Sequence, residues 1–148
     1  MAFLTTVIDK SSKQALPTNL PVRYGVAQYK VTATDTLDAD RTVKLQFVKK
    51  GTTILGMKVS HGAAGTTTSL QVGYTDSAST PNSDADAFMD ITDASSAGST
   101  VMATTAAGYF FSFAEDGWIT LWNDNSGDFA ADTTITVEYE YVVDDVSA

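Results

Sequence analysis

Apolar and polar residues alternate along most of the chain after residue 21, and the clearest example is the segment 133–143, TTITVEYEYVV. Its odd-numbered positions from Ile135 to Val143 are aliphatic or aromatic, whereas the even-numbered positions from Thr134 to Glu140 hold Thr and Glu. Successive side chains of a β-strand point to opposite faces, so this period of two predicts a strand with one face in a core. Val, Ile, Thr and Tyr are also the residue types that strands favour.

The same pattern recurs in shorter segments that are separated by turn residues. Glycine-containing separators such as KKGTT, HGAAGTT and EDGW supply the positive φ angles that tight turns require. Strands are predicted at 22–34, 43–48, 52–60, 67–75, 99–105, 108–114, 117–123 and 133–143. Several short strands without a helical period predict an all-β chain that forms a single β-sandwich or jelly-roll-like domain.

Alternation also assigns side chains to faces within these strands. Three sets are each expected to share a face: Val43, Leu45 and Phe47; Leu55, Met57 and Val59; and Leu70, Val72 and Tyr74. A strict period of two, without interruptions in the pairing, is the premise of these assignments.

Two predicted strands are apolar on both faces. In 108–114, Phe110 lies opposite the face that Tyr109, Phe111 and Phe113 share, and in 117–123 two tryptophans oppose Ile119 and Leu121. A strand of this kind is buried on both sides. The second cover has to come from a loop, from the N-terminal segment or from another subunit.

The N-terminal residues 1–21 read as an extended arm that precedes a β-sandwich domain at 22–148. Two Leu-Pro steps, ending at Pro17 and Pro21, restrict the backbone to extended geometry. The arm carries Phe3, Leu4, Val7 and Ile8. These side chains gain little by remaining in water, so we expect the arm to bind a groove or a sheet edge on a neighbouring protein. The alternative is an arm that folds back on its own sandwich.

Charge divides the chain into two unlike parts. Residues 1–58 hold all nine basic side chains and four acidic ones, a net charge of +5, whereas residues 59–148 hold fourteen acidic and no basic side chains, a net charge of −14. The acidic part would repel phosphates, so nucleic acid is not expected as a partner. Either the acidic part is simply a soluble surface, or the two parts meet different partners.

Composition removes several classes of chemistry. The chain has no cysteine, which excludes disulfides and thiolate metal sites, and its one histidine, His61, excludes multi-histidine zinc sites. No apolar run approaches the roughly 20 residues that span a bilayer, and the N-terminus lacks the pattern of a signal peptide. The expectation is a protein made and used without secretion, with no membrane partner.

Two oxygen-rich segments are candidate calcium sites. In NSDADAFMD (82–90), Asp84 and Asp86 alternate, but Phe88 and Met89 stand where further ligands and a glycine belong in a calcium loop. This segment is predicted to be an ordered loop with at most one helical turn, anchored by Phe88 and Ile91. NDNSGD (123–128), with Asp124, Asn125 and Asp128, is predicted to be an ordinary turn. No metal or cofactor is expected to be required for folding.

Catalytic and sugar-binding sites are disfavoured. Ser60 and His61 are adjacent, so on a strand they point to opposite faces, and no nucleophile elbow is present; an exposed turn histidine is expected instead. No phosphate-binding or dinucleotide motif occurs. Four aromatic residues offer a sugar-stacking platform, but packing in the core or at an interface is favoured because they lie inside strands: Tyr109, Phe110, Trp118 and Trp122. The sequence assigns no catalytic, cofactor-binding or metal-binding residue, and an enzyme is not expected.

The layout as a whole resembles a known group of proteins. An extended arm, a β domain of this size with the segment DADAF near its middle, and a final GDFAADTTITVEYEYV strand are similar to the small decoration (cement) proteins of tailed bacteriophages and cyanophages. The resemblance covers most of the chain in texture, with the final segment as its best part.

This resemblance implies a non-enzymatic protein that is made in the host cytoplasm and sits on the outer surface of a virion. It implies binding to the major capsid protein and a homotrimer at threefold positions, which locks neighbouring capsid subunits together. The alternative is a tail or baseplate adhesion module that binds surface glycans, and a cellular β-sandwich binding domain is third.

Overall fold

The computed structural model describes residues 21–38, 41–64, 68–123 and 127–144, and it confirms the predicted all-β sandwich. The strands are β1 (Arg23–Lys30), β2 (Thr42–Val48), β3 (Thr52–His61), β4 (Leu70–Asp76), β5 (Ser83–Ile91), β6 (Gly98–Val101), β7 (Gly117–Trp122) and β8 (Thr134–Val143). All pairings between them are antiparallel. Of the predicted arm, only Pro21 falls within the described residues.

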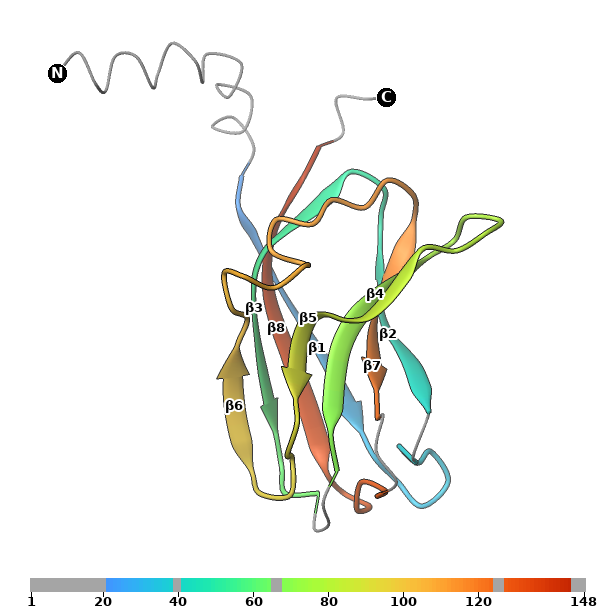
Figure 1. The fold of residues 1–148 in the computed structure, drawn as a ribbon, viewed down its shortest axis with the longest axis vertical. Coiled ribbons are helices and arrows are strands. Elements are labelled where there is room, and N and C mark those ends of the chain that lie inside the picture. Colours follow the sequence, from blue (N-terminus) through green and yellow to red (C-terminus); the bar gives the residue numbers. More distant parts are fainter. Residues whose placement is uncertain (1–20, 39–40, 65–67, 124–126, 145–148) are drawn as a thin grey trace, which may run out of the picture.

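The strands form two four-stranded sheets that face each other (Figure 1). The first sheet has the order β1-β8-β3-β6, and the second has the order β2-β7-β4-β5. Strands β1 and β2 therefore lie along one side of the sandwich, and β5 and β6 lie along the opposite side. In Figure 1, β6 lies at the left of the sandwich and β2 at the right.

The core lies between the two sheets and follows the alternation along the central strands. On β8, Ile135 and Val137 are fully buried, as their period of two predicts, and on β7 Ile119 and Leu121 meet them from the other sheet. Burial of each such side chain is worth about 1.5–3 kcal/mol relative to exposure. The predicted face shared by Leu70, Val72 and Tyr74 is confirmed, because the first two are buried and Tyr74 packs against the core.

The other two predicted faces are wrong, because β2 and β3 each contain a bulge. On β2, Lys44 pairs with Thr120 and Gln46 with Ile119, which leaves Leu45 as an extra residue and turns Phe47 outward. Phe47 is 42% exposed, and Val48 enters the core in its place. One inserted residue reverses the parity of every later side chain in the strand.

The bulge on β3 has the same consequence. Ile54 pairs with Tyr141 and Gly56 with Glu140, so Leu55 is the extra residue. Ile54 is therefore buried in the core together with Met57, whereas Leu55, which was expected beside Met57, is only half-buried.

The segment NSDADAFMD is not the predicted loop; it forms most of β5. Met89 pairs with Val72, and the strand continues to Ile91. Near its start the register shifts, so that residues 85–88 stand opposite the single residue Gly73. Strand β4 provides hydrogen-bond partners for the backbone of this segment, although its acidic composition had favoured a loop. Phe88 is buried, as predicted.

The predicted strand at 108–114 is also wrong. Its only pairing among the described residues is an isolated bridge between Ser112 and Thr53, and Phe110 has a φ of 58°. The segment instead crosses the end of the sandwich. Phe113 is nevertheless buried and Phe111 packs against the core, so the predicted face is retained without a regular strand.

Gly73 permits the closest backbone approach in the β4–β5 pair. A Cβ atom built at Gly73 would lie 1.9 Å from the carbonyl oxygen of Asp84 and 2.5 Å from the carbonyl carbon of Ala85. At Gly56, by contrast, the nearest atom would be 4.0 Å away.

We therefore expect Gly73→Ala to be strongly destabilising and Gly56→Ala to be close to neutral. The extra methyl group at position 73 has to push β5 away from β4, at a cost of about 1–3 kcal/mol or more in the free energy of unfolding. Urea denaturation of both variants measures the difference. Equal stability of the two variants would contradict the close approach at Gly73.

Candidate interaction surface

One end of the sandwich, where β1 begins and β8 ends, collects several exposed apolar and charged groups. We call it the arm end, and it comprises residues 21–23, 48–53, 102–117 and 141–144. The β6–β7 connection crosses it (Figure 1). The Asp144 amide donates to the carbonyl of Gly51 at 2.9 Å, which ties the end of β8 to the β2–β3 turn. The predicted arm joins the domain at this end, at Val22.

An aromatic cluster closes the arm end. Phe111 stacks on Tyr74 with ring centroids 4.0 Å apart, and it contacts Phe113 edge-on at 5.0 Å. The amide of Gly108 donates to the carbonyl of Ala87, which holds the connection against β5. The second cover that the sequence required is thus supplied in part by a loop of the same chain.

Phe110 is the exception in this cluster. It remains 58% exposed, and its left-handed backbone turns the side chain away from the core. A large apolar side chain held outward in an unfavourable backbone conformation is a candidate contact residue. Other large hydrophobic residues are exposed as well: Val22, Tyr24, Val26, Phe47 and Val101.

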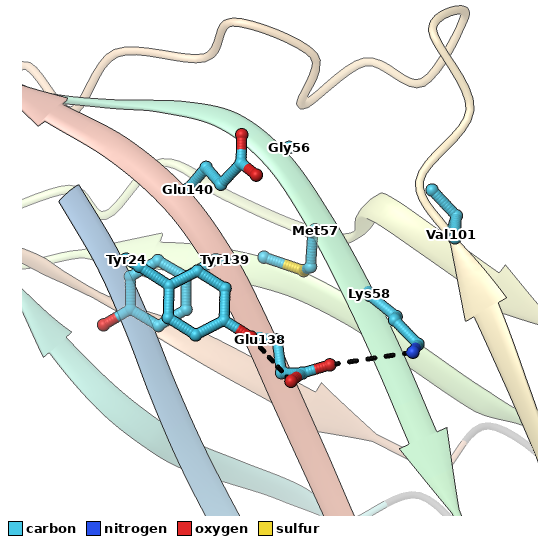
Figure 2. Close-up of a pocket in the computed structure, with 8 residues that line it drawn as sticks. All are labelled: Tyr24, Gly56, Met57, Lys58, Val101, Glu138, Tyr139 and Glu140. Atoms are coloured by element: carbon cyan, nitrogen blue, oxygen red, sulfur yellow. Dashed lines mark hydrogen bonds and ion pairs between the residues drawn. The ribbon is translucent and has the colours of Figure 1, made fainter. Parts of the chain in front are cut away.

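The outer face of the first sheet holds a shallow depression of about 350 Å³ (Figure 2). Glu138 lies at its centre, where it accepts a hydrogen bond from the Tyr24 hydroxyl at 2.6 Å and lies 4.0 Å from the Lys58 amine. The hydrogen bond to Glu138 raises the pKa of the Tyr24 hydroxyl. Gly56 leaves the upper part of the depression open beside Glu140.

The outer face of β7 is half-covered by its own neighbour β2. Phe47 packs edge-on against Trp118 with ring centroids 5.3 Å apart, and the Lys44 amine lies 6.0 Å from the Trp118 ring centroid. Trp118 and Trp122 are half-buried, opposite the core residues of β7, as predicted. The bulge that turns Phe47 outward therefore creates this aromatic contact.

The four aromatics considered as a sugar platform lie in two separate places. Tyr109 and Phe110 lie in the β6–β7 connection with their ring centroids 4.3 Å apart, whereas Trp118 and Trp122 lie on the outer face of β7. A stacking platform requires ring faces that are exposed side by side. The arrangement favours the packing interpretation of these residues.

The calcium candidates that the structure describes do not assemble a complete ligand set. Asp84 and Asp86 lie together on β5, while Asp128 is exposed between β7 and β8; Asp124 and Asn125 lie outside the described residues. Within the part of the chain that the structure describes, no group of three or more His, Cys, Asp or Glu side chains is placed to hold a metal ion. The two carboxyl groups of the pair on β5 do interact directly with each other.

A hydrogen bond between the Asp84 and Asp86 side chains raises the pKa of Asp84, and partial burial raises it further. The two residues are separated by Ala85 on β5, and this hydrogen bond holds their carboxyl groups together. Relative to the unfolded chain, the folded protein therefore binds the proton of Asp84 more tightly.

His61 is not the exposed turn residue that we expected. It is the last residue of β3, buried between Ile135 and Gly98, and its Nδ1 lies 2.9 Å from the carbonyl oxygen of Gly62. His61 lies at an alternate position to Met57 and Val59, so its side chain points into the sandwich as theirs do. Ser60 points outward instead, where its hydroxyl donates to Ser99 Oγ at 3.5 Å, so the two side chains do not meet.

Sequence reasoning missed the exposed residues Tyr24 and Val26. In the predicted strand 22–34, apolar residues occupy both parities, since Ala27 and Tyr29 are buried on the other face. Gln28 and Lys30 lie at the next alternate positions after Tyr24 and Val26, on the same face of β1. Their polar side chains are the feature of the sequence that identifies this face as the outer one.

The fold is similar to chains in three bacteriophage capsid structures. The capsid of Ralstonia phage GP4 contains a chain that matches with a TM-score of 0.69 and 14% identity, over 84% of this chain and 85% of that chain. The cyanophage Pam1 capsid gives a TM-score of 0.59 at 18% identity, over 85% and 86% of the two chains. The acidic stable capsid of Helicobacter pylori bacteriophage KHP30 gives 0.53 at 17% identity, over 82% and 87%.

At these identities the likeness shows a shared fold that extends over nearly the whole of each chain. No protein-family model matches the sequence, and no curated protein matches it. In the described ranges, no helix is long and apolar enough to cross a membrane.

The coupled carboxyl groups predict the pH dependence of stability. Because the pKa of Asp84 in the folded state is raised above the ordinary value of 3.8, its contribution is fully present below that pH and is lost as the pH rises through the folded-state pKa. At neutral pH two ionised carboxylates repel each other on β5. We expect Asp84→Asn to raise the melting temperature at pH 7, since the amide can donate to Asp86 without a charge.

The gain should shrink toward pH 3.5, where the wild-type carboxyl is itself protonated. Asp90→Asn is the matched control, because it removes a charge from an exposed position of the same strand and leaves the pair intact. Equal melting temperatures of wild type and Asp84→Asn across this pH range would contradict the coupling.

Proposed function

We propose that this protein is a non-enzymatic structural component of a phage virion that decorates the outer surface of the capsid and stabilises it by bridging capsid subunits. The observation that carries the proposal is the likeness to chains of three phage capsid structures, which covers at least 82% of this chain and 85% of each of those chains. A match of this extent relates whole chains rather than one shared supersecondary motif.

The N-terminal residues are the proposed attachment to the shell. They join the domain at the exposed Val22, at the same end of the sandwich as the exposed Phe110, so a partner bound to the arm can also meet apolar surface of the domain. The apolar residues of the arm would be buried by adding a strand to a sheet edge or by filling a groove on the major capsid protein. Lys10 and Lys13 of the arm, with Arg23, supply positive charge for an acidic shell.

We further propose that the protein acts as a homo-oligomer, and specifically as a homotrimer at a threefold position. Several apolar side chains remain exposed on one copy, and a further copy is a source of cover for them. Each copy of a trimer carries an arm, so three arms on one body bind a shell with high effective concentration. No cofactor, metal, nucleic acid or membrane has a part in this role.

Deletion of residues 2–20 tests the attachment. We expect the shortened protein to remain folded, with an unchanged strand signal in circular dichroism and a melting temperature within a few degrees of the wild type. It should no longer co-sediment with purified capsids or raise the temperature at which they rupture. Unfolding of the shortened protein, or undiminished binding, would contradict the proposed role of the arm.

Two full-length variants separate the apolar part of the arm from its charged part. Replacement of Phe3, Leu4, Val7 and Ile8 by Ser should abolish binding at every salt concentration. Replacement of Lys10 and Lys13 by Gln should weaken binding mainly at low salt, because exposed charge pairs are screened at high salt. A copy number of a few per virion, rather than one matching the capsid lattice, would favour a tail or baseplate module and overturn the decoration role.

A further inference from the structure

The two sides of the sandwich carry opposite charge. Six of the seven Lys and Arg residues among the described residues lie on β1, on β2 or directly beside β2: Arg23, Lys30, Arg41, Lys44, Lys49 and Lys50. Residues 83–101, which contain β5 and β6, hold four aspartates and no basic residue. We call these the basic side and the acidic side. Since β1 and β2 are the first strands of their sheets and β6 and β5 the last, the two sides face away from each other.

Each side also contains a recess with a partly apolar lining. The recess of the basic side, about 240 Å³, lies between β1 and β2 and is lined by Arg23, Phe47 and Lys49, among others. The recess of the acidic side, about 260 Å³, lies between β5 and β6 and is lined by Asp86 and Val101, among others. Charge and apolar surface therefore occur together on both sides.

The exposed apolar residues of the two sides lie at the same height along the strands. Val26 of β1 pairs with Glu138, Glu138 pairs with Lys58, and Lys58 pairs with Val101 of β6. These four residues form one row across the first sheet. Its two ends are the exposed valines, with Val26 at 52% and Val101 at 70%.

The charged residues match in height across the second sheet. One row runs from Asp90 through Gln71 and Trp122 to Thr42. Another row runs from Asp84 through Tyr74 and Ile119 to Gln46.

Lys44 of β2 pairs with Thr120, which lies between the levels of Ile119 and Trp122. The amine of the basic side is therefore level with the stretch of β5 between Asp84 and Asp90. When two copies are related by a rotation about an axis parallel to the strands, equivalent residues keep the same position along that axis. Such a rotation would bring Lys44 of one copy opposite these aspartates of the next copy, and Val26 opposite Val101.

We propose that copies of this chain associate head to tail, with the basic side of one copy against the acidic side of the next. This interface deepens the homo-oligomer part of the proposed function and does not depend on binding to a shell. Such heterologous contacts generate a ring when the rotation closes. Two like sides cannot pair in the same way, because like charges would face each other across the contact.

Engineered cysteines test the proposed register in a chain that has no cysteine of its own. Val26 and Val101 of one copy are three strand spacings apart, about 14 Å. A disulfide requires Cα atoms within about 7 Å, so a bond between these positions can form only between copies. Both residues are exposed, and substitution by cysteine should leave the fold intact.

Under mild oxidation we expect neither V26C alone nor V101C alone to cross-link to itself, whereas a mixture of the two gives a covalent dimer. The double variant V26C/V101C should give a covalent ladder that ends at the size of the ring. A mixture of V101C with T34C, an exposed position in the β1–β2 connection, is the matched control and should not cross-link. Self-cross-linking of V26C, or a mixture that cross-links no better than the control, would overturn the proposal.

Charge reversal tests the same interface without cross-linking. The variants K44E/K49E and D86K/D90K should each weaken self-association by more than about tenfold in analytical ultracentrifugation, because like charges then face each other. The variant with all four substitutions should recover it, since the two sides are complementary again. Undiminished association of both two-site variants, or no recovery in the four-site variant, would overturn the charge pairing. Both experiments use the purified full chain without capsids, so failure of shell binding is distinguishable from failure of this interface.

Discussion

An open sandwich of two four-stranded sheets leaves four strands with one unpaired edge each, and the rest of this molecule is arranged around that constraint. Exposed strand edges invite uncontrolled pairing with other chains. Strand β6 has only four residues, and the β6–β7 connection covers part of β5 through the hydrogen bond from Gly108 to Ala87. On the other side, β2 is interrupted by the bulge at Leu45. Strand β1, which the N-terminal residues precede, has eight residues, and among the described residues it pairs along one edge only, with β8.

The bulges on β2 and β3 determine which side chains of these strands enter the core and which reach the surface. Each inserts one leucine, so the residues before and after the insertion no longer follow a single alternation. Ile54, before the insertion in β3, and Val48, after the insertion in β2, therefore both lie in the core, while Phe47 turns to the outer face. Phe47 then covers Trp118 from the side, and Lys44 approaches the same ring. One inserted residue thus improves the cover of β7 and leaves an aromatic surface at the basic side.

The sequence was sufficient for the fold class and for the strands whose pattern is complete within themselves. Along β8, every residue from Ile135 to Tyr139 has the burial that its parity predicts. The pattern failed where parity depends on a partner strand, because a bulge at Leu55 is a property of the pair β3–β8 and not of either segment alone. It failed again at β5, where the acidic composition obscured a strand whose partner supplies the hydrogen bonds. The burial of His61 has a different cause: β3 extends one residue beyond the predicted strand, so His61 continues the inward row of Met57 and Val59 instead of lying in a turn.

Net charge adds a last constraint on how such a molecule can meet its own copies. Each copy carries −9, so two copies repel each other at distances beyond contact, and this repulsion is screened over about 8 Å at physiological salt. At contact the local arrangement replaces the net charge. Lys30 and Arg41 already form ion pairs with Asp132 and Asp35 of their own chain, so the remaining cations near β1 and β2 are the ones available to face acidic groups of another copy. Salt therefore acts in two opposing directions, since it weakens both the long-range repulsion and the contact pairs. An apolar contact between Val26 of one copy and Val101 of the next has no such dependence on salt. It is therefore suited to fix the register of the proposed contact, while the charges of the two sides fix which side faces which.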